Sequence, residues 1–576
     1  MSKSLHRPLL PGAPQPLPPI AAERTPILSE LVTYENRRGQ RIVGFHDYAK
    51  STPRDRPWMI VLPGYGETKT DVLAPSFYLA KNGFHTLRFD YSDHVGESDG
   101  EILTTTLPKL KDDILSAVDF LERRYAARPI GAFASSLACR SLLRAAREDE
   151  RIALLINFVS IVDVRKTLFA IYKEDHLERT LKGLPNGVMD VLGFQVDADN
   201  FLRAAVAENF GDLASTLEDA RGIKAPAVFF ASENDAWVDL DDVELVVSTL
   251  PTRRKELRVL KDGMHRLYEN PLVAKAALKG AVECALRYLP TVKPAARIGD
   301  LDLKEIGHRI RKEKERYRLL RGVNKDAERE FWKTYLEKYS FIINVHDYWN
   351  LLDFISRVLG ELKPGQRVLD GGCGIGNYGT FLLMKNIYRM RQAVSPGADA
   401  AGYAYAGVDF VSEAVAQARR THADFNREFG HGGLPARYSY LVADLESPLP
   451  FPARSFDQVC MNLVVSYLQE AGRTLADMAR LLKPKGRIVI TSLKPFADLS
   501  QVYRNYISVT EEAGQVEEAR KLLSNAGKVM AKEAEGIYRF FTEEELADLL
   551  KEAGLTDIET FRAFGNQANV AFGVVS

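Results

Sequence analysis

Residues 130–146 read IGAFASSLACRSLLRAA and decide how the first half of the chain is interpreted. An apolar run at 130–134 is followed by Ser136 and then at once by a helical pattern at 141–146. A sharp strand-to-helix turn needs small neighbours two residues on either side of a serine whose hydroxyl projects from the sheet, and Ala134 and Ala138 stand there in place of the usual glycines. The stretch predicts a nucleophile elbow, although such a serine can also be a packing or capping residue.

Two later residues favour the nucleophile. Asp235 follows the apolar run 225–231 in SENDAW, and His265 follows the run 257–260 in DGMH. A serine hydroxyl becomes a good nucleophile when a histidine takes its proton and a carboxylate orients that histidine. The alternatives are a turn aspartate and a surface histidine. Because all three residues follow predicted strands in the order that α/β-hydrolases use, we predict a catalytic triad of Ser136, Asp235 and His265.

The sequence also predicts an oxyanion hole and a cap beside this triad. An oxyanion hole needs the amide after the nucleophile and a second amide from a loop after an early strand, which assigns Leu137 and Tyr65 of the loop 63–66. About 65 residues separate the apolar run 152–159 from the run that starts at 225, too many for a simple crossover. We expect a helical cap there, with an acyl tunnel or simple sheet cover formed by apolar residues such as Leu168, Phe169, Leu192 and Phe194.

The second half contains VLDGGCGIG at residues 368–376, between an apolar run and a helical pattern. Glycines there let the backbone approach a ligand closely. Asp370, Asp409 and Asp444 stand at the ends of three successive predicted strands, where Asp409 suits ribose hydroxyls and Asp444 suits an adenine amino group. The pattern predicts a nucleotide-shaped site.

A dinucleotide site is the alternative, because Gly374, Gly376 and Gly379 have the spacing of a nicotinamide- or flavin-binding loop. Asp370 argues against it, since a carboxylate at the tip of the first strand would face a pyrophosphate but suits the ammonium group of a sulfonium ligand. Asp409 also lies 30 residues after Gly379, whereas a dinucleotide site places its acid about 20 residues on.

Composition narrows the class of protein. The 576 residues carry 77 basic and 77 acidic side chains, so no global cationic field favours nucleic acid. Hydrophobic residues make up 46% and charged residues 27%, as in a soluble globular protein. Four scattered cysteines fit neither a disulfide framework nor a zinc site, and no apolar run resembles a signal peptide or a transmembrane helix. We therefore expect a cytoplasmic protein without a metal.

Two segments alternate short apolar runs with amphipathic stretches, which indicates two parallel sheets covered by helices. We expect a flexible tail at 1–25, a first domain at 26–290, a charged helical linker at 291–340 and a second domain at 341–576. The linker is either a solvated spacer or a docking surface for an acidic carrier protein. The predicted strands are 58–62, 84–89, 130–134, 225–231 and 257–260 in the first segment and 367–370, 405–409, 438–442, 458–462, 486–491 and 569–575 in the second.

The first segment resembles a known family. The strings NGFH at 82–85, HVGES at 94–98 and ASSL at 134–137, with Asp235 and His265, are similar to the acyl transferases of bacterial bioluminescence over about residues 27–288. The resemblance implies an α/β-hydrolase that releases fatty acyl chains from acyl carrier protein as a thioesterase. Ser136 would be the acylated nucleophile, Asp235 the orienting acid and His265 the general base.

The second segment resembles the class I S-adenosylmethionine-dependent methyltransferases over about residues 341–576, also through FPARSFD at 451–457 and LKPKG at 482–486. The resemblance implies a Rossmann-like fold and S-adenosyl-L-methionine as cofactor. The absence of paired prolines after Asn462 argues against a nucleic-acid acceptor and for a small or lipid-like one. The implied cofactor contacts are Gly372, Gly374 and Gly376 at the methionine moiety, Asp409 at ribose, Asp444 and Leu445 at adenine, and Asn462 beside the reactive methyl.

The fusion of these segments predicts a bifunctional enzyme of lipid metabolism, in which linkage raises the concentration of one site's product near the other. A fatty acid released at Ser136 and then methylated is one order of events, and an ester made first and cleaved later is the reverse. The alternative is that only one half is catalytic, while the other is a ligand-binding or scaffolding module.

Overall fold

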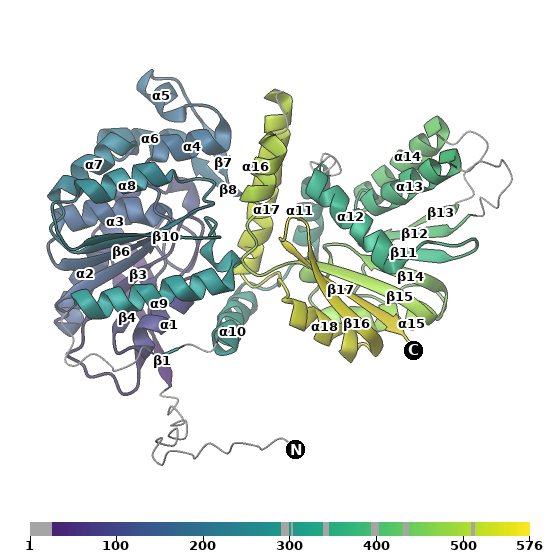
Figure 1. The fold of residues 1–576 in the computed structure, drawn as a ribbon, viewed down its shortest axis with the longest axis horizontal. Helices are drawn as coiled ribbons and strands as arrows, with labels where there is room; N and C mark the ends of the chain where they lie inside the picture. Colours follow the sequence, from purple (N-terminus) through teal and green to yellow (C-terminus); the bar gives the residue numbers. More distant parts are fainter. Residues whose placement is uncertain are drawn as a thin grey trace, which may run out of the picture.

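The computed structural model describes residues 26–289, 299–300, 303–337, 342, 345–392, 402–429, 437–508 and 513–576. Two α/β units lie side by side, and helices α16 (Ser500–Ser508) and α17 (Ala513–Ala534) stand between them (Figure 1). The tail expected at 1–25 lies outside the described residues.

The first unit is built on an eight-stranded sheet with the order β1-β2-β4-β3-β5-β6-β9-β10. β2 pairs antiparallel with both β1 and β4, and the strands from β4 to β10 are parallel. This is the α/β-hydrolase arrangement expected from the sequence. The strands are β1 (Ile27–Glu35), β2 (Arg41–Ala49), β3 (Trp58–Leu62), β4 (His85–Phe89), β5 (Ile130–Ser135), β6 (Ile152–Phe158), β9 (Ala227–Ser232) and β10 (Lys255–Leu260).

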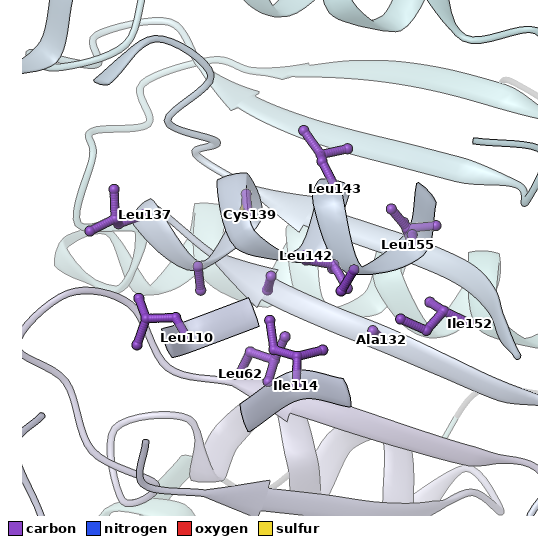
Figure 2. Packing of buried hydrophobic residues seen from close by; sticks show 14 of the residues in the cluster. Leu62, Leu110, Ile114, Ala132, Leu137, Cys139, Leu142, Leu143, Ile152 and Leu155 are labelled. Carbon is purple, nitrogen blue, oxygen red and sulfur yellow. The ribbon is translucent and has the colours of Figure 1, made fainter. Parts of the chain in front are cut away.

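Helices cover both faces of this sheet. α2 (Leu107–Tyr125), α3 (Leu137–Glu148) and α8 (Leu240–Thr249) pack on one face, and α1 (Leu73–Lys81) and α9 (Pro271–Tyr288) pack on the other. Figure 2 shows Leu62 and Ala132 of the sheet against Ile114 of α2 and Leu142 of α3. Central strands β3 and β5 are buried along almost their whole length, so they hold the elbow that follows β5 in one place.

The expected cap lies between β6 and β9. Its elements are α4 (Val164–Tyr172), α5 (His176–Leu181), β7 (Val188–Val191), β8 (Phe194–Asp197), α6 (Ala198–Ala207) and α7 (Leu213–Gly222). It is not entirely helical, because β7 and β8 form an antiparallel hairpin. That hairpin reaches α17 of the second unit, a contact between distant segments that the spacing of the sequence did not indicate.

The second unit has a seven-stranded sheet with the order β13-β12-β11-β14-β15-β17-β16. β17 runs antiparallel to β15 and β16, and the other pairs are parallel. The strand order reverses between β11 and β14, which is where open α/β sheets bind ligands. The strands are β11 (Arg367–Gly371), β12 (Ala404–Asp409), β13 (Arg437–Val442), β14 (Phe456–Met461), β15 (Leu482–Leu493), β16 (Leu555–Ala563) and β17 (Ala568–Val575).

The helices of this unit agree with the expected Rossmann-like fold. One of them, α18 (Glu543–Glu552), begins with a capping box, in which the Thr542 hydroxyl accepts from the Glu545 amide and the Glu545 carboxylate accepts from the Thr542 amide. The helices around the sheet are α12 (His346–Leu359), α13 (Asn377–Gln392), α14 (Ser412–Phe429), α15 (Ala471–Leu481) and α18 (Glu543–Glu552).

The charged stretch between the units forms α10 (Leu303–Arg321) and α11 (Lys325–Glu337), and it is not a solvated spacer. Glu313 of α10 accepts hydrogen bonds from the fully buried Arg88 of β4 at 2.8 and 3.0 Å, and Lys314 pairs with Glu533 of α17 at 2.7 Å. Charges that pair with distant residues look the same in sequence as charges that face water. For this reason the solvated-spacer interpretation is wrong.

Direct contacts also join the two units. Lys494 and Glu269 form a buried ion pair, and the Tyr503 hydroxyl donates to the Ile171 carbonyl at 2.9 Å. Gly527 of α17 lies against the cap hairpin so closely that a Cβ there would stand 1.6 Å from the Leu192 carbonyl oxygen. The backbone of α17 therefore touches the backbone of the cap.

We expect Gly527→Ala to lower the free energy of unfolding by about 1–3 kcal/mol, because the added methyl forces α17 away from Leu192. Differential scanning calorimetry measures this change. The matched control is Gly472→Ala in α15, where the nearest atom to an added Cβ is 3.9 Å away and stability should be unchanged or slightly raised. An equal effect of both substitutions would contradict the close backbone contact.

Among the described helices, none combines the length and the apolar character needed to cross a membrane.

Candidate active sites

The predicted elbow lies between β5 and α3. Ser136 has φ 55° and ψ −125°, a backbone conformation that residues with a side chain rarely adopt. Its amide donates to the Phe158 carbonyl at 2.9 Å, and its carbonyl accepts from the Ile161 amide at 3.3 Å. These bonds to the neighbouring strand and the segment after it hold the strained turn, as a nucleophile elbow requires.

The structure brings the three predicted triad residues together. Ser136 Oγ lies 2.8 Å from His265 Nε2, and His265 Nδ1 lies 2.8 and 2.9 Å from the two Asp235 carboxylate oxygens. Asp235 Oδ1 also accepts from the Trp237 and Val238 amides at 2.8 and 3.1 Å. The amides fix the carboxylate and the carboxylate fixes the imidazole, which leaves Nε2 directed at the serine.

The environment of His265 favours its protonated form. Burial alone lowers its pKa, but the charge of Asp235 and the hydrogen bond to it outweigh burial, and Asp498 and Glu67 add further negative charge. The pKa of His265 is therefore raised above its ordinary value of 6.5. Asp498 belongs to the second unit, so both halves of the chain set the basicity of this imidazole.

The loop 63–66 lies next to the serine. The Gly64 amide donates to the Glu67 carboxylate at 2.7 Å, and the Gly66 amide donates to His94 Nε2 at 3.3 Å. Burial lowers the pKa of His94 to about 4, so this imidazole is a neutral acceptor. The two amides that flank Tyr65 are thus engaged, and the assignment of the Tyr65 and Leu137 amides to the oxyanion hole stays a prediction.

Glu67 is a residue that sequence reasoning missed. It lines the cavity around Ser136, and its carboxyl carbon would be 3.4 Å from a Cβ added to Gly64, which would itself lie 3.3 Å from the Ser136 Cβ. Burial is the main cause of its raised pKa, and Asp71 adds to the effect. No motif indicated Glu67, because its importance depends on the fold of its loop against the elbow.

The second candidate site lies at the reversal point of the seven-stranded sheet. Asp409 Oδ2 accepts from the Gly374 amide at 2.9 Å, and Asp409 Oδ1 accepts from the Val411 amide at 2.9 Å. Asp370 is buried and accepts from the Tyr405 hydroxyl at 2.6 Å, and burial raises its pKa to about 7. Gly372 has φ 76°, and a Cβ there would meet Val464 at 2.3 Å, so this turn requires glycine.

Most of the other predicted residues of this site line the same cavity, which we call the glycine-loop cavity. It is bounded by Asp370, Gly372, Gly374, Asp409, Asp444, Leu445 and Asn462, together with residues of α11 and α17. Asn462 accepts from the Thr491 hydroxyl at 2.9 Å and donates to the Tyr348 hydroxyl at 3.3 Å. The Asn462 side chain, directly after β14, is thus held at the cavity wall by hydrogen bonds on both of its polar atoms.

Two predicted residues differ from expectation. Gly376 is absent from the described lining of the cavity and faces α14, where a Cβ would meet Ala418 at 2.8 Å. The lack of a side chain at Gly376 allows close packing against α14, and its contact with a ligand stays a prediction. Asp444 lines the cavity, but its carboxylate accepts from Lys325 of α11 at 2.6 Å. Its negative charge is thus already paired with a lysine.

Helix α11 supplies a wall that the sequence reasoning left out. Trp332, Tyr335 and Leu336 line the glycine-loop cavity, and Leu336 lies 3.3 Å from the position of a Cβ on Gly374. The aromatic cluster at 331–335, inside a stretch that is otherwise dense in charge, was the signal that could have indicated a buried face there.

Comparison with known proteins decides the class of each half. The family described as acyl transferase matches residues 30–288, and the family described as methyltransferase domain matches residues 335–560. The chain combines an acyl transferase domain with a methyltransferase domain. Both resemblances drawn from the sequence are confirmed at the level of these families.

Individual relatives match the acyl transferase domain. An acyl transferase of Photorhabdus laumondii is 29% identical over 237 residues, which are 41% of this chain and 76% of that protein. An acyl transferase of Photobacterium phosphoreum is 26% identical over 228 residues, 40% of this chain and 74% of that protein. Among solved structures, an esterase from Pyrococcus furiosus aligns with 46% of this chain and 94% of its own at 18% identity and a TM-score of 0.34.

The cavity around Ser136, which we call the serine cavity, is built by both domains. The acyl transferase domain supplies the triad end and the apolar cap residues, among them Leu168, Leu192, Phe194, Phe201 and Leu202. The methyltransferase domain supplies the opposite part of the lining: Phe496, Ala497, Asp498, Leu499, Ser500, Leu523, Ala526, Gly527, Met530, Ala531, Glu533, Ala534 and Phe540. An apolar cavity of this kind suits an acyl chain, and neither domain forms it alone.

Proposed function

We propose that this chain is a bifunctional enzyme, in which a serine acyl hydrolase or transferase acts on fatty acyl thioesters and an S-adenosylmethionine-dependent methyltransferase acts on a small or lipid-like acceptor. The hydrogen-bonded series from Ser136 through His265 to Asp235 at an apolar cavity carries the proposal. The thioester is one borne on acyl carrier protein or a similar carrier, and the reaction takes place in the cytoplasm.

In the acyl transferase domain, Ser136 Oγ attacks the thioester carbonyl while His265 Nε2 takes its proton. The amides of Leu137 and Tyr65 stabilise the negative charge that develops on the carbonyl oxygen. His265 then returns the proton to the leaving thiol, and a water molecule or another acceptor releases the acyl group by the same steps in reverse. Asp235 holds the imidazole in the required tautomer and stabilises its positive charge.

The residues of the glycine-loop cavity fit an S-adenosylmethionine ligand. Asp409 offers a carboxylate to the ribose hydroxyls, Gly372 and Gly374 let the backbone approach, and Asp370 lies at the tip of the first strand. When bound, this ligand would supply a methyl group activated by a positively charged sulfur as leaving group. Leu445 and Asp444 would hold the adenine side of this ligand and Asn462 would lie on its methyl side, so the chain's task is to orient the acceptor and exclude water.

Two measurements on the full chain test both halves. A fluorophosphonate probe should label Ser136, as identified by mass spectrometry, and S-adenosylhomocysteine should bind in isothermal titration calorimetry. If the probe labels nothing, the acyl transferase domain is a binding module. If S-adenosylhomocysteine raises the melting temperature but no methyl transfer occurs across a broad acceptor panel, the methyltransferase domain is only a sensor or scaffold.

The rate of acyl ester cleavage should fall as the pH is lowered, because protonated His265 cannot accept the serine proton. Since the pKa of His265 is raised, the midpoint of this fall should lie above pH 6.5. Asp498→Asn removes one of the charges that raise this pKa and should move the midpoint to lower pH. The measurement is a pH profile of kcat/KM. Asp190→Asn is the matched control, since this interface carboxylate pairs with Lys528 and should leave the midpoint in place.

A further inference from the structure

The serine cavity and the glycine-loop cavity share part of their walls. Leu499 and Ala526 line both cavities, and each side chain is only 6% exposed. Leu499 precedes α16 and Ala526 lies on α17, so both belong to the segments that stand between the two domains (Figure 1). Two side chains thus form a thin partition between the two candidate active sites.

Helix α17 exposes different faces to the two cavities. Leu523, Gly527 and Met530 line the serine cavity, spaced so that they lie on one side of the helix, and Val529 lines the glycine-loop cavity. Ala526 stands between these faces and reaches both spaces. Ala526 is the smaller of the two side chains that line both cavities.

The partition adjoins the end of the serine cavity where the chemistry takes place. Asp498, directly before Leu499, accepts a hydrogen bond from the Arg266 amide at 3.2 Å, and Arg266 follows the candidate base His265. The charge of Asp498 also acts on His265. A carboxyl group formed at Ser136 therefore emerges near Leu499, while its apolar chain occupies the part of the cavity covered by the cap.

Charges of both signs lie beside the partition, because Arg266 and Asp498 both line this end of the serine cavity. The Arg266 guanidinium lines the serine cavity beside the triad and donates to the Ala497 carbonyl at 3.5 Å, within the same short segment as Leu499. The proposed methyl donor carries a positive sulfur on the other side. The Arg266 guanidinium attracts a fatty carboxylate in this direction, and the carboxylate of Asp498, which accepts from the Arg266 amide, opposes that attraction.

A carboxylate also fits the acceptor chemistry of the glycine-loop cavity. Among the described residues that line it there is no histidine, and its lysine, Lys325, is paired with Asp444 and Glu446. A carboxylate at neutral pH is already ionised and needs no base. An acceptor that must lose a proton would depend on one of the acids in the lining, such as Asp370 with its pKa raised to about 7.

We propose that the acid released at Ser136 passes directly between the two cavities, past Leu499 and Ala526, and is the acceptor of the methyl group. The inference rests on the proposed function of both domains. A carboxylate oxygen forms the new bond to the methyl carbon while the carbon–sulfur bond breaks and its electron pair stays on sulfur. The negative carboxylate and the positive sulfonium give a neutral methyl ester and a neutral thioether, and no proton moves.

Isotope dilution tests direct passage. The full chain is given carbon-13-labelled dodecanoyl coenzyme A and S-adenosylmethionine in the presence of a large molar excess of unlabelled dodecanoic acid. With direct passage the methyl ester carries mainly the label of the thioester. If the ester carries the label fraction of the free acid pool, or if no methyl ester forms, the inference is overturned.

A substitution locates the passage. Ala526→Phe adds a large side chain to the wall that the two cavities share, so the label fraction of the ester should fall to that of the free acid pool. The matched control is Ser524→Phe, because Ser524 is half-buried on the same helix and lines neither cavity. The label fraction is measured on whatever ester is formed, so a change in overall rate does not alter it. Full label retention in Ala526→Phe would contradict this route.

Photo-crosslinking gives a readout that needs no methyl donor. Ser136→Ala is incubated with a dodecanoic acid that bears a diazirine close to its carboxyl group, then irradiated and mapped by mass spectrometry. We expect adducts on Leu267, which lines only the serine cavity, and on Leu493 or Phe564, which line only the glycine-loop cavity. Adducts confined to the serine cavity would overturn the inference.

Thiol release from the thioester and calorimetric binding of S-adenosylhomocysteine are measured on the same preparations. If either is missing, the proposed function of that domain fails. If both are present and the label is diluted, the two activities stand and only the direct passage is wrong.

Discussion

Ser136→Ala is expected to lower kcat for acyl ester and thioester cleavage by at least about 10³-fold, since the hydroxyl that forms the acyl intermediate is lost. The hydroxyl is 2.8 Å from His265 Nε2, and the alanine leaves the rest of the site in place. Release of p-nitrophenol from medium-chain esters and of thiol from acyl thioesters measures the change. Binding of S-adenosylhomocysteine should persist, because its cavity uses other residues.

The neighbouring serine is the matched control for this substitution. Ser135 is the last residue of β5, and Ser135→Ala should still react with a fluorophosphonate probe at Ser136. Persistence of cleavage in Ser136→Ala at a rate near that of the unmodified chain would contradict the assignment of the nucleophile. If Ser136→Ala also lost binding of S-adenosylhomocysteine, the substitution would have caused a folding defect, which circular dichroism detects.

Asp409→Ala is expected to weaken binding of S-adenosylhomocysteine by about 10²- to 10⁴-fold. Two hydrogen bonds from ribose hydroxyls to a carboxylate contribute about 1.5–3 kcal/mol each. Asp409 also holds the Gly374 amide at 2.9 Å, so its loss loosens the glycine loop. Isothermal titration calorimetry measures the affinity, and acyl ester cleavage in the same sample reports that the acyl transferase domain is intact.

Asp424→Ala is the matched control, because Asp424 lies on α14 after the same strand and is largely exposed. Asp409→Asn is a second variant that keeps an acceptor for the Gly374 amide and separates loss of ribose contact from loss of loop order. A ligand analogue without ribose hydroxyls should bind Asp409→Asn and the unmodified chain alike. If the analogue discriminates between the two, Asp409 does not act through the ribose.

Much of the fold followed from local patterns. Every predicted apolar run overlaps a strand, because buried parallel strands are short continuous apolar segments bounded by turns. The antiparallel strands β1, β2, β7, β8 and β16 were missed. β1 and β16 are largely exposed or half-buried and carry charged residues among their apolar ones, so they lack the apolar run that marks a central strand.

The candidate sites were predicted where function depends on the end of a strand. Ser136, Asp235 and His265 follow β5, β9 and β10, and the carboxyl ends of parallel strands meet at one edge of a sheet. Glu67, Asp498 and helix α11 were missed, because each reaches its site only through contact with a segment distant in the chain. No spacing rule connects such residues.

The sequence by itself determined two α/β units, the elbow at Ser136 and the acids around the glycine loop, since strand periodicity and turn chemistry are written in neighbouring residues. Only the tertiary structure decided that α17 of the methyltransferase domain closes the serine cavity of the acyl transferase domain. It also decided that Leu499 and Ala526 lie between the serine cavity and the glycine-loop cavity. The physical reason is that packing between domains depends on the shape of folded surfaces. Residues nearly 400 positions apart, such as Ser136 and Ala526, share a wall without leaving any periodic signal.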